Sequence, residues 1–188
     1  MKLLHKLGKY HNLDKLNKIV ESIYNTTGSI TGSWAGTSIT KCHDFGCASY
    51  ALWQTLGVDW HIDDIYKNRK YSIILVIRSN DYQLYVSTVN EDILDSFFKT
   101  YDTTFRDINE RIDYLSLRRK DTQKVIVKTG DILLLNTSYY HKLENTKKTK
   151  NPFIFASLDI DFIPEFKEAI RVVNYFVHDF FATINTHD

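Results

Sequence analysis

The apolar runs that are typical of β-strands all lie in the middle of this chain of 188 residues. Residues 71–77 are rich in Ile, Leu and Val and are bounded by polar residues, which predicts a strand buried on both faces. Residues 132–135 form a second such run, and residues 82–89, 125–127 and 152–160 predict further strands. Many short strands with helical segments on both sides favour an antiparallel double sheet that is braced by helices.

Apolar residues with helical spacing lie on both sides of these runs. They predict one helix over residues 13–24 and another over residues 165–183, whose start follows Pro164. Residues 90–119 are more polar and helical in parts, and we expect an insertion there that forms a lid or recognises a substrate. Residues 48–56 fit a short helix or a strand equally well.

The sequence shows no internal repeat and no domain boundary, and its length is sufficient to bury one core. We therefore expect a single domain over residues 1–188. It would have helical support over residues 1–27, a β core over residues 57–160 and a C-terminal helix over residues 165–183.

The composition argues against several classes of function. The formal net charge is +1, so no strong field attracts the chain to nucleic acid or to a membrane surface. No run approaches the roughly 18 apolar residues of a membrane span, and the N-terminus lacks the apolar stretch of a signal peptide. Two cysteines are too few for a disulfide scaffold, so we expect a cytoplasmic, reducing location.

Two distant segments contain the residue types of a metal site. In a strand, alternate residues share a face, so His61 and Asp63 would project together. His141 follows a buried strand and the polar corner at residues 136–138, which predicts a position at the open end of a sheet. Two imidazoles and one carboxylate can hold one face of an Fe(II) ion and leave the opposite face open. We therefore expect the three donor atoms to converge on one point.

Each of these residues also has a simpler interpretation. A His-x-Asp triplet arises by chance about as often as not in a chain of this composition. His141 could be a surface histidine beside a lysine cluster. Cys42 and Cys47 could form half of a zinc site, but no second pair exists, which favours unligated cysteines. The tryptophans fit either a pocket wall or the core: Trp34, Trp53 and Trp60.

The order of these features resembles that of the Fe(II)- and 2-oxoglutarate-dependent dioxygenases, most of all their prolyl-hydroxylase and phytanoyl-hydroxylase branches. The resemblance covers residues 57–160 and consists of His-x-Asp, an apolar strand, a Gly-Asp turn before a second apolar strand, a His and another apolar strand. It implies a double-stranded β-helix, a cupin-like variant of the jelly-roll. It also implies that His61, Asp63 and His141 bind Fe(II). Oxygen and 2-oxoglutarate would then be consumed, succinate would form, and a protein side chain or small molecule would be hydroxylated.

The family pairs the distal carboxylate of 2-oxoglutarate with an Arg or Lys, usually placed shortly after the second His. Lys150, nine residues beyond His141, is the best match in this chain. A lysine would act as a point charge without the two-pronged grip of arginine. Arg78, at the end of the strand predicted over residues 71–77, is the alternative base. Tyr71 or Ser72 could add a hydroxyl contact to the cosubstrate.

Other details of the resemblance narrow the expected reaction. Family members that halogenate have a small residue in place of the carboxylate, so Asp63 favours hydroxylation. No Arg-rich signature follows His141, which disfavours nucleic-acid demethylation. Two alternatives stay open: a cupin-like metal-binding protein or enzyme that does not use 2-oxoglutarate, and a non-catalytic jelly-roll binding module. The sequence leaves the primary substrate open.

Overall fold

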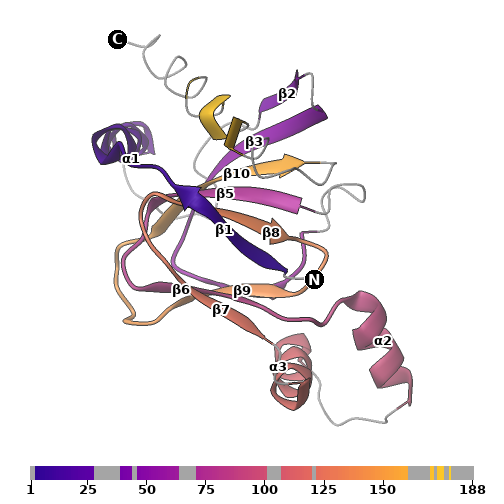
Figure 1. Cartoon of the computed structure of the whole chain (residues 1–188). Helices are drawn as coiled ribbons and strands as arrows, with labels where there is room; N and C mark the ends of the chain where they lie inside the picture. Colours follow the sequence, from indigo (N-terminus) through magenta and orange to yellow (C-terminus); the bar gives the residue numbers. More distant parts are fainter. Residues whose placement is uncertain are drawn as a thin grey trace.

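The computed structural model describes residues 3–27, 39–43, 46–63, 71–100, 107–119, 122–160, 170–171, 173–175 and 178. In this part of the chain, the strands form two antiparallel sheets that face each other (Figure 1). The order in the six-stranded sheet is β1 (Leu4–Lys9), β8 (Asp131–Asn136), β5 (Tyr71–Arg78), β10 (Phe153–Ile160), β3 (Gly46–Thr55) and β2 (Ile39–His43). The order in the four-stranded sheet is β4 (Val58–His61), β9 (His141–Asn145), β6 (Tyr82–Val86) and β7 (Gln123–Val127).

Successive strands of the core cross repeatedly from one sheet to the other. Strands β3, β5, β8 and β10 belong to the six-stranded sheet, and β4, β6, β7 and β9 belong to the four-stranded sheet. Every pairing between neighbouring strands is antiparallel. This order is that of a double-stranded β-helix, a jelly-roll variant. The predicted fold class, mainly β with flanking helices, is therefore confirmed.

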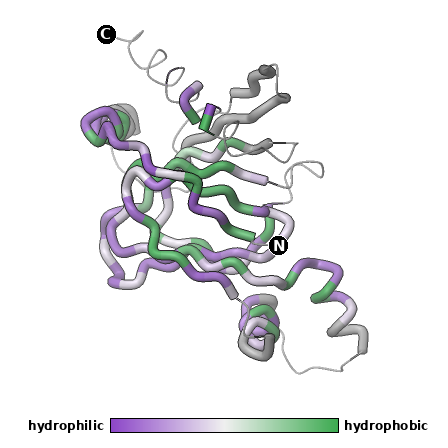
Figure 2. Tube along the Cα trace, in the orientation of Figure 1, coloured by the Kyte–Doolittle hydropathy of each residue, from purple (hydrophilic) through white to green (hydrophobic). Residues whose placement is uncertain are grey.

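Strand β5 shows why its sequence is apolar without alternation. Ile73, Leu75 and Ile77 belong to the cluster on the outer face of the large sheet, while Ile74 and Val76 face the interior between the two sheets. Both faces of the strand are covered, so both need apolar side chains. Figure 2 shows the same concentration of hydrophobic residues along the central strands of the large sheet. The prediction of a strand buried on both faces is confirmed.

Helix α1 (Leu13–Thr27) covers the outer face of the large sheet. It begins after Asn12, whose side-chain oxygen accepts a hydrogen bond of 3.1 Å from the Lys15 backbone N–H, as an N-cap does. Leu16 and Ile19 are fully buried in the outer cluster. The helix predicted over residues 13–24 is thus confirmed and runs three residues further. Most of the helix predicted over residues 165–183 lies outside the described residues; those that are described there are helical.

The N-terminal segment differs from the prediction of helical support over residues 1–27. Leu4–Lys9 form strand β1, which pairs with β8 at the edge of the large sheet. Leu4 packs in the inner cluster and Leu7 in the outer cluster, so the two leucines of β1 cover both faces of the strand. Tyr10 follows β1 and lies beside Gly130, which precedes β8. Gly130 has a positive φ of 86°, and a Cβ there would lie 2.5 Å from the Tyr10 carbonyl oxygen. Glycine is therefore required where the two segments meet.

The insertion at residues 90–119 contains two helices, α2 (Glu91–Thr100) and α3 (Ile108–Arg119), as predicted. They lie together beside one end of the small sheet (Figure 1). Ile112 and Leu115 of α3 pack with Trp60 and Val89 in a separate cluster. A function as a lid or substrate-recognition element stays a prediction. The ambiguous residues 48–56 are strand except for the last one. No helix in the described ranges is long and apolar enough to cross a membrane.

Candidate metal centre

His61, Asp63 and His141, hereafter the triad, lie together at one end of the four-stranded sheet, beside the end of β8. His61 closes β4 and is directly opposite His141, the first residue of β9. Their ring centroids are 4.3 Å apart. Asp63 follows two residues later, and its backbone N–H donates a hydrogen bond of 3.3 Å to the Thr137 carbonyl oxygen. Ile62, between the two triad residues of this segment, packs instead against the cluster that contains Trp60.

The end of β4 is fixed by contacts of Trp60 with α3. The indole Nε1–H donates a hydrogen bond of 2.7 Å to Asp113 Oδ1, and the Trp60 backbone N–H donates to Asn109 Oδ1 at 3.1 Å. Lys142 Nζ lies 5.0 Å from the centroid of the Trp60 ring and 3.6 Å from Asp113 Oδ1. Since Trp60 precedes His61 and Lys142 follows His141, these contacts help to hold both histidine backbones in place.

The distances within the triad suit a shared ion. His61 Nε2 lies 3.6 Å from Asp63 Oδ1, and His141 Nε2 lies 3.6 Å from Asp63 Oδ2. All three potential ligand atoms lie within 4.8 Å of one another. Two donors that are each about 2.1 Å from one ion are roughly 3 Å apart when their bonds are perpendicular and about 4.2 Å apart when opposed. The measured nitrogen–oxygen separations fall in that range and exceed the length of a hydrogen bond.

Both imidazoles present the same nitrogen to Asp63, for the same reason. His61 Nδ1 is 2.7 Å from the Asp59 carbonyl oxygen, and His141 Nδ1 is 2.9 Å from the Tyr139 carbonyl oxygen. A carbonyl oxygen only accepts, so each Nδ1 carries a proton and donates it. In the neutral ring, Nε2 then has a free lone pair. A backbone carbonyl that accepts the Nδ1–H is one of the usual groups by which proteins orient a metal-binding histidine.

Burial keeps His141 in its ligand form. The side chain is 6% exposed, and desolvation lowers its pKa. The negative charge of Asp63 acts in the opposite direction, and the neighbouring His61 lowers the pKa of His141 further. The net direction favours the neutral imidazole at neutral pH, which is the form that binds a metal. His61 and Asp63 are more exposed, at 36% and 43%, so the site opens to solvent on that side.

A cavity of about 300 Å³ extends from the triad into the space between the sheets. Its wall is mainly apolar: Trp53, Val58, Ile74, Leu84, Val127, Leu133, Leu135, Leu143, Phe153 and Phe155. Four hydroxyl-bearing residues also line it: Thr55, Ser72, Thr137 and Ser157. Trp53 Nε1–H donates a hydrogen bond of 2.8 Å to Ser157 Oγ. Among the described residues, the buried Ser72 Oγ has no hydrogen-bond partner.

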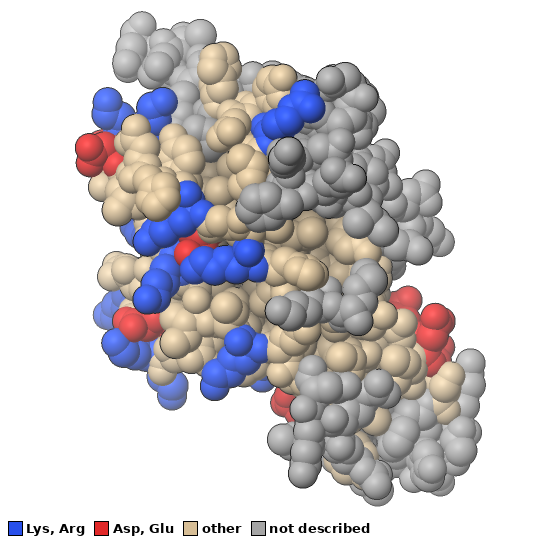
Figure 3. All heavy atoms as spheres, in the orientation of Figure 1, with Lys and Arg blue, Asp and Glu red and all other residues tan. Residues whose placement is uncertain are grey.

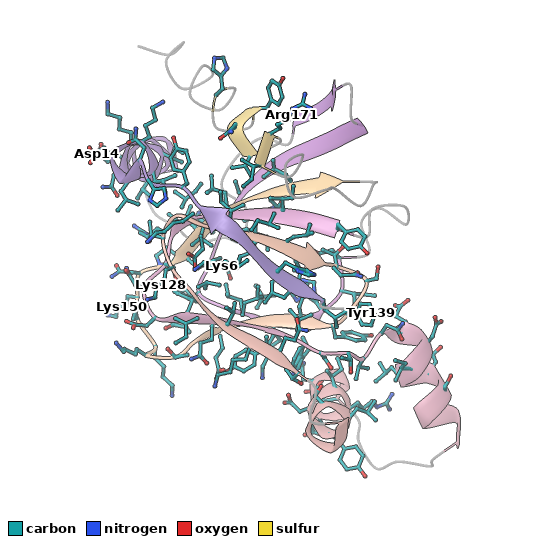
Figure 4. All side chains as sticks on the ribbon, in the orientation of Figure 1. Lys6, Asp14, Lys128, Tyr139, Lys150 and Arg171 are labelled. Carbon is teal, nitrogen blue, oxygen red and sulfur yellow. The ribbon has the colours of Figure 1, made fainter. Side chains whose placement is uncertain are left out.

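Of the residues expected to contact 2-oxoglutarate, Lys150, Arg78 and Tyr71 lie outside this cavity wall. Lys150 is exposed in the loop before β10. It lies at the opposite end of the sheets from Tyr139, which precedes the triad histidine by two residues (Figure 4). That is also the side on which Lys and Arg gather, away from α2 (Figure 3).

Arg78 and Tyr71 do not line the cavity, and the length of β5 places Arg78 far from the triad end. Arg78 ends the strand, six residues and about 20 Å beyond Ser72. Its Nε–H donates a hydrogen bond of 3.3 Å to the Pro152 carbonyl oxygen. Tyr71 packs against the cluster on the outer face of the sheet. Its neighbour Ser72, named with it from the sequence, does line the cavity.

Several residues of the site had no clear sequence signal. The carbonyls of Asp59 and Tyr139 each lie two residues before a triad histidine, a spacing that becomes informative only when the backbone course is known. Of the tryptophans, Trp53 lines the cavity and Trp60 packs in a core cluster. Trp34 lies outside the described residues. Cys42 and Cys47 occupy directly opposed positions on β2 and β3.

No protein-family model matches the chain, and no curated protein matches it either. Solved structures that resemble it include AviO1 from Streptomyces viridochromogenes Tue57, at 8% identity and a TM-score of 0.46, covering 83% of this chain and 88% of that one. The nickel complex of the non-heme monooxygenase ThoJ has 8% identity and a TM-score of 0.46, with 84% and 72% covered. The non-heme alpha ketoglutarate dependent epimerase SnoN from nogalamycin biosynthesis has 7% identity and a TM-score of 0.48, with 85% and 78% covered.

These TM-scores are below 0.5, so the fold is assigned from the strand order of this chain and not from the similar structures. The strand order and the donor set together define a class: a double-stranded β-helix with two histidines and one carboxylate at the open end of its sheets. That donor set is the facial triad of non-heme Fe(II) oxygenases. The resemblance found in the sequence is confirmed at the level of this fold and triad.

Proposed function

We propose that the protein is a non-heme oxygenase that holds one Fe(II) ion through His61 Nε2, His141 Nε2 and the Asp63 carboxylate. The observation that carries the proposal is the shared orientation of the two imidazoles, each with Nδ1–H on a backbone carbonyl and Nε2 toward Asp63. Three protein ligands leave open positions on the metal for substrate and oxygen. When bound, Fe(II) supplies the activation of oxygen.

The residues of the chain would orient the ligands and exclude water. Buried His141 stays neutral, while the backbone hydrogen bond of Asp63 to Thr137 fixes the carboxylate-bearing segment against the end of β8. The apolar wall beyond the triad keeps solvent from the interior, which protects a reactive centre from side reactions. The aromatic ring of Trp53 is held in this wall by its hydrogen bond to Ser157.

The finer proposal is a hydroxylase that uses 2-oxoglutarate, as the resemblance implies. The metal end of the site fits it, because a 2-oxo acid binds a metal through neighbouring oxygens. The distal carboxylate does not fit the described cavity wall, where none of the residues is Lys or Arg. This favours a second candidate, a cupin-like metal-dependent enzyme that does not use 2-oxoglutarate.

Anaerobic reconstitution followed by calorimetric titration with Fe(II) tests the proposal. One equivalent should bind to the wild-type protein, and His61→Ala and Asp63→Ala should abolish that binding. His11→Ala, which removes an exposed histidine far along the chain, is the matched control and should bind normally. Succinate released from 2-oxoglutarate under oxygen would support the hydroxylase, whereas stoichiometric Fe(II) without succinate would support the second candidate. A wild-type protein that binds no Fe(II) would exclude both.

A further inference from the structure

We infer that the organic ligand of this site is a 2-oxo acid with an uncharged, apolar tail, and that the tail occupies the cavity between the sheets. The inference rests on the proposed metal centre and concerns the part of the ligand that is remote from it. The inferred ligand is a monocarboxylate of similar length to 2-oxoglutarate, the dicarboxylate that the family resemblance implies.

The cavity wall is apolar in successive layers below the triad. In the small sheet, the layer that follows His141 is the register pair Leu84 and Leu143. In the large sheet, the facing layer is the register pair Ile74 and Leu133. A tail that extends from the metal therefore meets aliphatic side chains on both sides. Such a wall stabilises a hydrocarbon tail by removing it from water.

Aromatic rings continue this wall. Phe155 of β10 is the register partner of Trp53 on β3, and both line the cavity. The rings of Phe153 and Phe155 are 5.3 Å apart, and Tyr82 lies 5.3 Å from Phe153. A carboxylate placed among these rings would lose its hydration without gaining an ion pair from the described wall. The same rings would pack against an isopropyl or phenyl group.

One buried hydroxyl gives the cavity a polar feature that suits a ligand oxygen. Ser72 lines the cavity, and its Oγ is shielded from solvent and lacks a hydrogen-bond partner among the described residues. Buried hydroxyls are normally paired, so a partner from a ligand is expected. Ser157, also on the inner wall, already accepts the Trp53 hydrogen bond. A few polar contacts within an apolar wall are typical of small-molecule sites, and the cavity volume of about 300 Å³ suits a small ligand.

The test compares two ligands of the same shape on the full-length protein loaded anaerobically with Fe(II). In 5-methyl-2-oxohexanoate, an isopropyl group replaces the distal carboxylate of 2-oxoglutarate. Calorimetric titration should give at least about a tenfold lower Kd for 5-methyl-2-oxohexanoate. Along the series 2-oxobutanoate, 2-oxopentanoate and 2-oxohexanoate, each methylene should tighten binding about fourfold. Equal or tighter binding of 2-oxoglutarate would overturn the inference.

Two controls separate this result from its alternatives. The acid 5-methylhexanoate has the tail but no oxo group, and it should bind at least about tenfold more weakly than its oxo analogue. Equal binding of both acids, with or without Fe(II), would overturn the arrangement of head on metal and tail in cavity. A protein that binds Fe(II) but prefers 2-oxoglutarate would contradict only this inference, whereas absence of Fe(II) binding would contradict the proposed function itself.

A variant places the missing charge in the wall. Phe155→Arg should reverse the preference toward 2-oxoglutarate, because a guanidinium can pair with its distal carboxylate. Phe155→Leu keeps the wall apolar and should retain the wild-type preference. If both proteins fold and bind Fe(II) but share the wild-type preference, Phe155 does not contact the tail and the inference fails. If Phe155→Arg does not fold, the wild-type ligand comparison decides alone.

Discussion

The two ends of the cavity differ in how the chain builds them. At the triad end, donor atoms are oriented by backbone carbonyls and by the pairing of β4 with β9. In the interior, the wall consists of side chains that alternate along the strands of both sheets. The first arrangement depends on backbone course and would define the proposed metal site. The second depends on side-chain identity and would define which ligand can enter. We therefore expect that ligand preference can change without a change in the proposed metal ligands.

The largest expected effect of a single change at the triad end is that of His141→Ala. Removing a ligand should weaken Fe(II) binding by more than about 100-fold, the upper range for loss of an outer partner. Calorimetric titration measures this effect directly. Retention of wild-type affinity would show that the metal binds elsewhere and would remove the basis for separating the two ends.

Leu143→Ala, two residues along the same strand, is the matched change in the interior. This side chain is 8% exposed and lines the cavity, so its truncation should lower the free energy of unfolding by about 2–4 kcal/mol. One equivalent of Fe(II) should still bind below the unfolding transition. Urea denaturation gives the stability, and exposed Leu56→Ala should change it little. A loss of Fe(II) binding in the folded Leu143→Ala protein would break the comparison.

A smaller effect is expected from the contact that positions β4. Trp60→Phe keeps a ring in the cluster but removes the hydrogen bond to Asp113. We expect Fe(II) affinity to fall by about tenfold, as for outer groups that orient ligands. Asp113→Asn, which keeps an acceptor oxygen, is the control and should have a weaker effect. An unchanged Fe(II) affinity in Trp60→Phe would show that β4 needs no support from α3.

The smallest expected effect is a dependence of stability on pH in the metal-free protein. Burial lowers the pKa of His141 below the value of about 6.5 expected in the unfolded chain. As the pH falls, the unfolded chain takes up this proton first, so stability is present above about pH 6.5 and is lost toward the folded-state pKa. Urea denaturation at several pH values should show a shallower decline for His141→Gln. An identical decline in both proteins would contradict the assignment.

The sequence correctly predicted the strands with continuous apolar runs, and it predicted that the three triad residues come together. The strands β5, β8 and β10 are covered on both faces or filled with large aliphatic residues, so their composition is distinctive. Strands β1 and β9 were missed because each has only a few apolar residues and is stabilised by its pairing partner. Propensity within a short segment contains no information about such tertiary pairing.

The base expected to pair with 2-oxoglutarate shows a second limit of inference from sequence, because neither candidate lines the cavity. Lys150 follows His141 closely along the chain, but β9 runs away from the triad, and the loop that contains Lys150 lies at the other end of the sheets. Arg78 is separated from the triad end in the same way by the length of β5. The spatial distance of each base from the triad could be judged only when the direction of the strands was known. The cavity residue Phe155 had no sequence pattern that marked it as part of a site.

A crystal structure of the protein soaked with Mn(II) under anaerobic conditions tests the central claim most directly. We expect one ion bound by His61 Nε2, His141 Nε2 and an Asp63 oxygen, each at about 2.0–2.2 Å. Both Nδ1–H groups should keep their backbone carbonyl partners. An ion bound elsewhere, or a well-ordered structure in which the three donor atoms do not share an ion, would contradict the proposed metal centre.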